Sequence, residues 1–239
     1  MNADSSSGVS RIQLERRVLA RSLLVVAGFV DAVAFLYLGG TFVSFMSGNT
    51  TVLGSSPSTR QWSEAAECGG IIALFFVGVV AGSVCNRLSW GTRWRLTAIV
   101  TAGMGLVLLL ALTVSGLSAM LVTAVVTGMI NATFENDRSV RGGLTYVTGT
   151  LVTAGRELAD ILAPSTRHSA DRRAWLISLS SWALLAVGAV AGGFAYQWIR
   201  LPALWFPFGL LLVVLVLGAV LRPSATPGRA GTPTPTTGQ

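Results

Sequence analysis

The chain of 239 residues is 52% hydrophobic and only 11% charged, with a mean hydropathy of +0.66. So little charge cannot coat a water-soluble globule of this length, so composition excludes that class and indicates a membrane protein. The net charge of +7 comes from 17 basic residues against 10 acidic ones. All of the basic residues are arginines at the ends of apolar segments, where they orient a protein in the bilayer rather than bind nucleic acid.

The first half of the chain begins with a polar stretch followed by apolar segments. Residues 1–16 are predicted to form a disordered, basic N-terminus, and residues 18–38 a membrane helix. The next segment, 41–54, would be about 21 Å long as a helix, which is too short to cross about 30 Å of hydrocarbon. Two further helices are predicted over 65–88 and 96–114.

The second half repeats this order of segments. A helix is predicted over 117–134, followed by a polar linker over 135–141 and a second short segment over 142–155. A charged loop then leads to helices over 174–198 and 203–221. The tail, 222–239, is rich in Pro and Thr and is predicted to be disordered.

The two halves share residues at matching positions, with offsets of 100, 101 and then 110 residues. The matching pairs are Gly28/Gly128, Asp31/Asn131, Ala32/Ala132, Ser44/Thr145, Ser47/Thr148, Gly48/Gly149, Gly78/Gly188 and Gly82/Gly192. Self-similarity at this long period indicates a duplicated domain rather than a short-repeat solenoid. We therefore predict a first membrane repeat over 17–115 and a second over 116–221.

Arginine positions favour one of two topologies. If both short segments span the membrane, the loop that carries Arg87, Arg93 and Arg95 falls outside the cell, against the positive-inside rule. If both dip in and return, both termini are cytoplasmic and only Arg60 and Arg200 lie outside. We therefore predict an all-α polytopic protein with about six transmembrane helices and two short re-entrant or broken helices. Three crossings per half make this an inverted 3+3 repeat, while full spanning of the short segments stays open as the alternative.

Short, interrupted helices in an inverted duplication are typical of transporter binding sites, because their unpaired backbone groups need polar partners inside the membrane. The small polar residues of both short segments are therefore candidates to bind a solute. These candidates are Ser44, Ser47, Gly48, Asn49, Thr50, Thr145, Thr148, Gly149 and Thr150. The alternative interpretation is that these small residues only permit close helix packing.

Asp31 is the one acid placed deep in an apolar helix, about 15 Å beyond Arg21. An acid near the bilayer centre is costly and is a functional candidate by default. It is a candidate for solute binding and for proton or cation coupling, together with its counterpart Asn131, which cannot ionise. The alternative is that Asp31 caps unpaired backbone groups of the neighbouring short segment.

Residues 28–32 read Gly-Phe-Val-Asp-Ala, 45–50 read Phe-Met-Ser-Gly-Asn-Thr, and 146–150 read Tyr-Val-Thr-Gly-Thr. With these paired strings, the sequence over about 17–221 resembles the YoaK-type family of bacterial multi-pass membrane proteins of unknown function. It departs from the family pattern at Ser47, where Thr is usual, but a hydroxyl is retained. The resemblance implies a location in the bacterial cytoplasmic membrane and supplies no substrate.

Two functions are compatible with these features. The first is a secondary transporter or facilitator of a small solute, working by alternating access of the two inverted repeats. The second is a non-transporting membrane scaffold or assembly partner. The sequence has no phosphate-binding or metalloprotease motif and a single histidine, so we expect no enzyme activity, cofactor or metal. The expected partners are the lipid bilayer, the unidentified solute and, as an open alternative, further copies of the chain.

Overall fold

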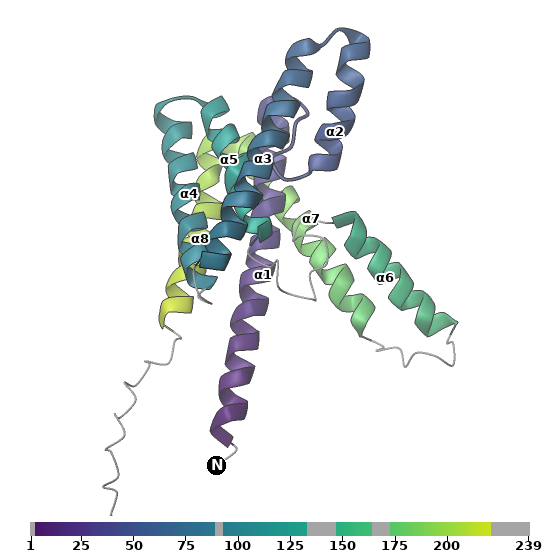
Figure 1. The fold of residues 1–239 in the computed structure, drawn as a ribbon, viewed down its shortest axis with the longest axis vertical. Coiled ribbons are helices and arrows are strands. Elements are labelled where there is room, and N and C mark those ends of the chain that lie inside the picture. Colours follow the sequence, from purple (N-terminus) through teal and green to yellow (C-terminus); the bar gives the residue numbers. More distant parts are fainter. Residues whose placement is uncertain (1–2, 89–92, 133–146, 164–172, 221–239) are drawn as a thin grey trace, which may run out of the picture.

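The computed structural model describes residues 3–88, 93–132, 147–163 and 173–220, and every regular element in those ranges is a helix (Figure 1). The first half contains α1 (Ala3–Leu38), α2 (Met46–Ser55), the short 3-10 helix η1 (Ser56–Thr59), α3 (Trp62–Leu88) and α4 (Arg93–Thr113). The second half contains α5 (Gly116–Ala132), α6 (Val147–Leu162), α7 (Ala174–Ile199), the 3-10 helix η2 (Leu201–Leu204) and α8 (Trp205–Val220). The predicted all-α class is confirmed.

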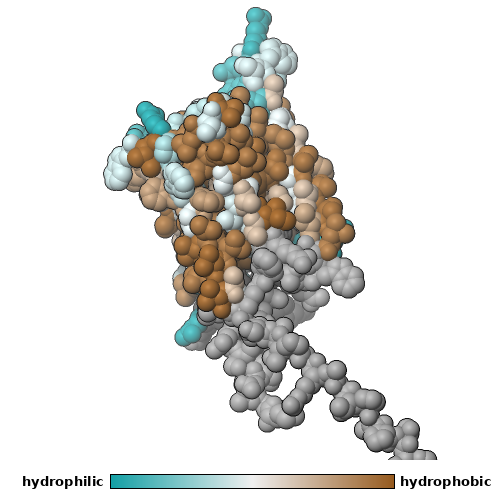
Figure 2. All heavy atoms as spheres, turned by 90° about the vertical axis from the view of Figure 1, so that its left-hand side faces the viewer, coloured by the Kyte–Doolittle hydropathy of each residue, from teal (hydrophilic) through white to brown (hydrophobic). Residues whose placement is uncertain are grey.

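Within the described residues, four stretches of helix are long and apolar enough to cross a membrane: Arg17–Leu38, Trp62–Leu88, Ala174–Ile199 and Leu201–Val220. Thr97–Thr113 and Gly116–Ala132 are shorter apolar helices. Large apolar side chains such as Trp198 are widely exposed, as expected where the surrounding solvent is lipid. On the face over α4 and α8, apolar side chains cover the middle of the molecule, with hydrophilic ones at its ends (Figure 2). The chain is therefore a helical membrane protein.

Two helices extend more than five residues beyond the predicted ends. The first, α1, begins at Ala3 and includes residues assigned above to a disordered N-terminus. Once a helix is nucleated, each added residue gains a backbone hydrogen bond, so the apolar segment extends into the polar one. The second, α6, continues past the predicted end at Gly155 to Leu162. The polar linker 135–141, the start of the short segment 142–155 and the tail 222–239 lie outside the described residues.

Close contact through glycine brings α1 and α7 together. A Cβ atom added at Gly28 would lie 2.1 Å from the carbonyl oxygen of Leu185, and one at Gly188 would lie 2.2 Å from that of Val25. One added at Gly192 would lie 2.4 Å from the carbonyl oxygen of Phe29. Only glycine permits backbones this close, so these positions fix where the two helices cross.

Helices α3 and α5 make the same kind of close contact, through the residues that match those of α7 and α1. A Cβ atom at Gly128 would lie 2.2 Å from the carbonyl oxygen of Phe75, and one at Gly78 would lie 2.1 Å from that of Val125. Each residue of α5 in these contacts lies 100 positions after its match in α1, and each residue of α3 lies 110 positions before its match in α7. These are the offsets of the sequence match. Each close pair thus joins a helix of one half to a helix of the other.

The remaining helices pack around these two pairs. Helix α2 packs against α3, α6 against α7, and α4 and α8 against each other and against α5 and α1 respectively. Gly116, at the start of α5, lies against Tyr37 near the end of α1 and against Leu201 of η2. The end of α1, the α4–α5 turn and the α7–α8 junction therefore lie at the same end of the molecule.

Candidate functional site

The chain reverses direction after α1 and returns into the bundle. Gly39 and Gly40 have φ angles of +74° and +130°, in a region that favours glycine, and the amide of Gly40 donates to the carbonyl oxygen of Phe35 at 3.0 Å. Residues 41–45 have no helical structure, and α2 begins at Met46. Val43 and Ser44 in this segment are buried. Their backbone groups therefore need partners inside the protein.

Asp31 of α1 supplies two of those partners. Its Oδ1 atom accepts hydrogen bonds from the amides of Val43 at 2.9 Å and Ser44 at 2.7 Å, and its Oδ2 atom accepts one from the Ser44 hydroxyl. Asp31 is 9% exposed. Asp31 therefore caps backbone amides of this segment, as one of the two sequence interpretations proposed.

Two more side chains bind the same segment. The fully buried Asn49 accepts a hydrogen bond from the Phe42 amide at 2.9 Å and donates one to the Phe42 carbonyl at 2.6 Å. Thr127 of α5 donates its hydroxyl to the Val43 carbonyl oxygen at 2.6 Å. Side chains of α1, α2 and α5 therefore satisfy the non-helical backbone that precedes α2.

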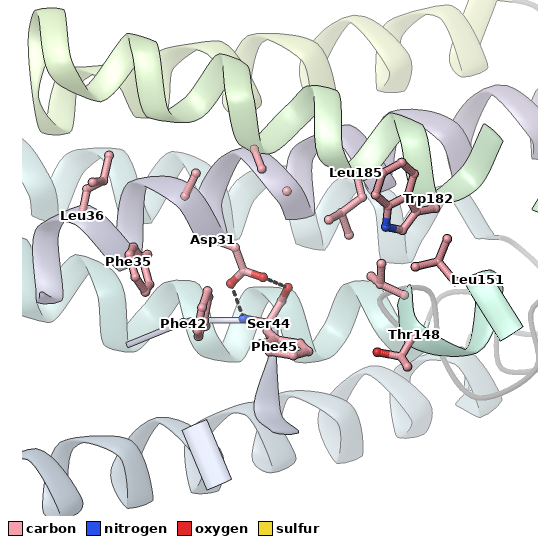
Figure 3. Close-up of a pocket in the computed structure, with 14 residues that line it drawn as sticks. Asp31, Phe35, Leu36, Phe42, Ser44, Phe45, Thr148, Leu151, Trp182 and Leu185 are labelled. Atoms are coloured by element: carbon pink, nitrogen blue, oxygen red, sulfur yellow. Dashed lines mark hydrogen bonds between the residues drawn. The ribbon is translucent and has the colours of Figure 1, made fainter. Parts of the chain in front are cut away.

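A cavity of about 580 Å³ lies beside this segment (Figure 3). Its walls come from α1, from the residues just before α2, from the first turns of α6, and from α7. The lining residues are Gly28, Asp31, Ala32, Phe35, Leu36, Phe42, Ser44, Phe45, Val147, Thr148, Leu151, Trp182, Leu185 and Ala189. A volume of several hundred Å³ with mostly apolar walls and a few polar groups is usual for a small-molecule site.

The two short helices approach this cavity by their N-terminal ends. Phe45 immediately precedes α2, and Val147 is the first residue of α6. From the cavity, α2 and α6 extend in opposite directions along the molecule (Figure 1). The halves therefore contribute to one cavity through matching segments, while the bodies of the helices pack on α3 and α7.

The predicted site residues divide into two groups. Asp31, Ser44 and Thr148 line the cavity. The other described candidates do not line it: Ser47, Gly48, Asn49, Thr50, Asn131, Gly149 and Thr150. Asn131 donates a hydrogen bond from its side chain to the carbonyl of Thr127. At Gly48, the absence of a side chain leaves room for the Phe45 ring. Thr145 lies outside the described residues.

Sequence reasoning missed the aromatic wall of the cavity and the role of Thr127. Phe42 lies with its ring centroid 5.0 Å from that of Phe35 and 5.2 Å from that of Phe45, and Trp182 comes from α7. The two phenylalanines that flank the small polar residues of the first short segment were the available signal. Nothing in the sequence marked Trp182, because a tryptophan in an apolar helix most often faces lipid or core.

Comparison with known protein families gives a match that extends from α1 to α8. Residues 19–217 match the family described as "Protein of unknown function (DUF1275)". The chain belongs to this family. It is also 30% identical to "UPF0700 transmembrane protein RA0705" of Rhizobium meliloti (strain 1021), over 82% of this chain and 88% of that protein. No solved structure matches the chain. The expectation of a transmembrane family of unknown function is confirmed.

Proposed function

We propose that this DUF1275-family chain is a secondary transporter or facilitator of a small solute, rather than an enzyme. The proposal includes six membrane crossings, two re-entrant segments, an inverted 3+3 repeat and two cytoplasmic termini in the bacterial plasma membrane. The YoaK-type assignment is part of the same proposal, because it rests on the paired sequence strings.

The observation that carries this proposal is the cavity shared by the two halves. Asp31 and Phe45 from the first half face Thr148 and Trp182 from the second across the same space. Inverted-repeat transporters bind solute where discontinuous helices of the two repeats meet near the middle of the membrane. A cavity lined by only one half would leave the second repeat without a part in solute binding.

The glycine contacts support the inverted repeat. Gly28 and Gly128 are matching residues, and their backbone contacts, at Leu185 and Phe75, are also matching residues. A pseudo-two-fold relation between the halves accounts for this equivalence, and so does the packing of α2 on α3 and α6 on α7. The contacts define two groups, α1, α6 and α7, and α2, α3 and α5, and each group contains helices of both halves. The cavity lies between the first group and the segment 42–45 that leads into α2 of the second group, so alternating access would be rocking of these two groups against each other.

Access of water to the cavity from the two sides of the membrane tests the proposal without a known solute. On a background with Cys68→Ala and Cys85→Ala, a Thr148→Cys variant is treated with an impermeant thiol reagent in right-side-out and inside-out vesicles. Thr123→Cys on α5, which is fully buried and outside the cavity lining, is the control. We expect labelling of Thr148→Cys from both sides and no labelling of Thr123→Cys.

Labelling of Thr148→Cys from one side only, or from neither, would favour the scaffold. The hydrogen bonds of Asp31 and Asn49 to the backbone do not distinguish the two functions, because they would hold the non-helical segment in place in a scaffold as well. A scaffold does not require a cavity that water reaches from both sides of the membrane, so this measurement separates the two functions. A flux screen in proteoliposomes then identifies the solute.

A further inference from the structure

One residue carries the charge in the described wall of the cavity. Among the described lining residues, Asp31 is the only one with an ionisable side chain in the physiological range, and the other polar side chains are the hydroxyls of Ser44 and Thr148 and the indole of Trp182. A cavity with one carboxylate and no arginine in its described wall disfavours an anionic ligand.

The hydrogen bonds of Asp31 orient its carboxylate but do not neutralise it. In the described part of the chain its partners are the backbone amides of residues 43–45 and the Ser44 hydroxyl, all of them uncharged. A buried ion without a counter-ion costs several kcal/mol, whereas pairing with an opposite charge offsets much of that cost. No positive charge in the described residues bonds to Asp31, so a proton or a cation in the cavity is the partner that would offset this cost.

The remaining walls suit the apolar part of such a ligand. Phe35, Phe42 and Phe45 form a chain of ring contacts along one side, and Trp182 lies in the wall on α7 (Figure 3). Aromatic faces attract cations, most strongly when both are out of water. Leu151 and Leu185 add purely apolar surface.

We propose that the cavity binds an organic cation that carries apolar substituents, with its positive centre at Asp31 and its substituents against the aromatic rings. This rests on the proposed function, for which it names the substrate class. A proton on Asp31 in the empty cavity would leave when the cation enters, so binding of cation and of proton are mutually exclusive.

Two probes of closely similar shape and opposite charge test the class: tetraphenylphosphonium and tetraphenylborate. Equilibrium dialysis against the purified full chain in detergent measures the binding of each. We expect saturable binding of tetraphenylphosphonium, at least about tenfold weaker binding of it by Asp31→Asn, and a clear preference for it over tetraphenylborate. Asp160→Asn on α6, which removes the same charge at an exposed site outside the cavity lining, is expected to bind like the wild type.

A second pair of variants tests the aromatic wall. Trp182→Leu should weaken tetraphenylphosphonium binding by about threefold or more, and Trp182→Phe, which keeps a ring, should weaken it less. Trp198→Leu, at an 82% exposed position outside the cavity lining, is the control and should have no effect.

Equal binding of the two probes, absence of tetraphenylphosphonium binding, or an affinity that Asp31→Asn leaves unchanged would each overturn the assignment to organic cations. None of these results bears on whether the cavity opens to both sides of the membrane. Labelling of Thr148→Cys decides that question independently, so failure of the substrate class and failure of the transport proposal are distinguishable.

Discussion

The hydroxyl of Thr127 on α5 donates to the carbonyl oxygen of Val43 at 2.6 Å, joining residues 84 positions apart in the sequence. Thr127 is fully buried, and the carbonyl belongs to the non-helical segment that precedes α2. This hydrogen bond therefore ties a helix of the second half to the cavity wall of the first half.

Replacing Thr127 by Val should destabilise the protein by about 1 to 3 kcal/mol, because the Val43 carbonyl is left without this donor in a buried place. The matched control is Thr123→Val, one turn earlier on α5 and equally buried, whose hydroxyl bonds to the Ala119 carbonyl of its own helix. Thermal unfolding in detergent, followed by circular dichroism, measures both variants. Equal effects of the two would show that the bond to Val43 has no special weight.

The adjacent residues Gly192 and Gly193 on α7 should respond differently to the same substitution. A Cβ atom at 192 would lie 2.4 Å from the Phe29 carbonyl oxygen, whereas one at 193 would meet nothing within 4 Å. We expect Gly192→Ala to cost about 1 to 3 kcal/mol by forcing α1 and α7 apart. Gly193→Ala should be neutral or stabilise by up to about 1 kcal/mol, because alanine is the better helix former.

Expression level and thermal stability of these two variants in detergent give the comparison. Similar loss of stability in both would mean that α1 and α7 do not cross at Gly192. The corresponding change in the other pair, Gly82→Ala, should behave like Gly192→Ala, because its Cβ atom would lie 2.8 Å from the Ala132 side chain.

Asp31 should tolerate an amide but not the loss of its hydrogen-bonding group. Asp31→Ala removes the acceptor of the Val43 and Ser44 amides, and two unpaired buried donors should cost about 2 to 6 kcal/mol. In Asp31→Asn, the side-chain oxygen can still accept from both amides and its NH₂ group can donate to the Ser44 hydroxyl oxygen. Its stability should stay within about 1.5 kcal/mol of the wild type.

Size-exclusion chromatography and thermal unfolding in detergent distinguish the two variants. Asn131 already holds an amide at the matching position of α5, which supports this expectation. If Asp31→Ala is as stable as Asp31→Asn, the carboxylate does not hold the segment before α2.

The arginine distribution predicts which loops face the outside of the cell. With an impermeant thiol reagent on intact cells, and with Cys68 and Cys85 replaced, Ser58→Cys in η1 should be labelled. Ser89→Cys, beyond the end of α3 and outside the described residues, should not be labelled until the cells are permeabilised. The reverse pattern would contradict six crossings with cytoplasmic termini.

Sequence alone determined that this protein lies in a membrane and is helical, because these properties follow from composition and from the length of the apolar runs. It also identified the repeated residues and Asp31 as the buried acid, from internal identity and from the position of Asp31 in an apolar run. It did not determine which helices pair. Both close pairs, α1 with α7 and α3 with α5, join residues far apart in the chain. A helix that is apolar on all sides has no hydrophobic face from which its neighbour could be predicted.

The cavity was likewise decided by the tertiary structure. Sequence marked Asp31, Ser44 and Thr148, but it grouped them with Asn49 and Thr50, which bond to backbone instead. Phe42 and Trp182 face one cavity only because the chain reverses at Gly39 and Gly40 and α7 crosses α1 at Gly28. A polar side chain in lipid must bond to something, and only the folded backbone determines whether that partner is a carbonyl, an amide or a ligand.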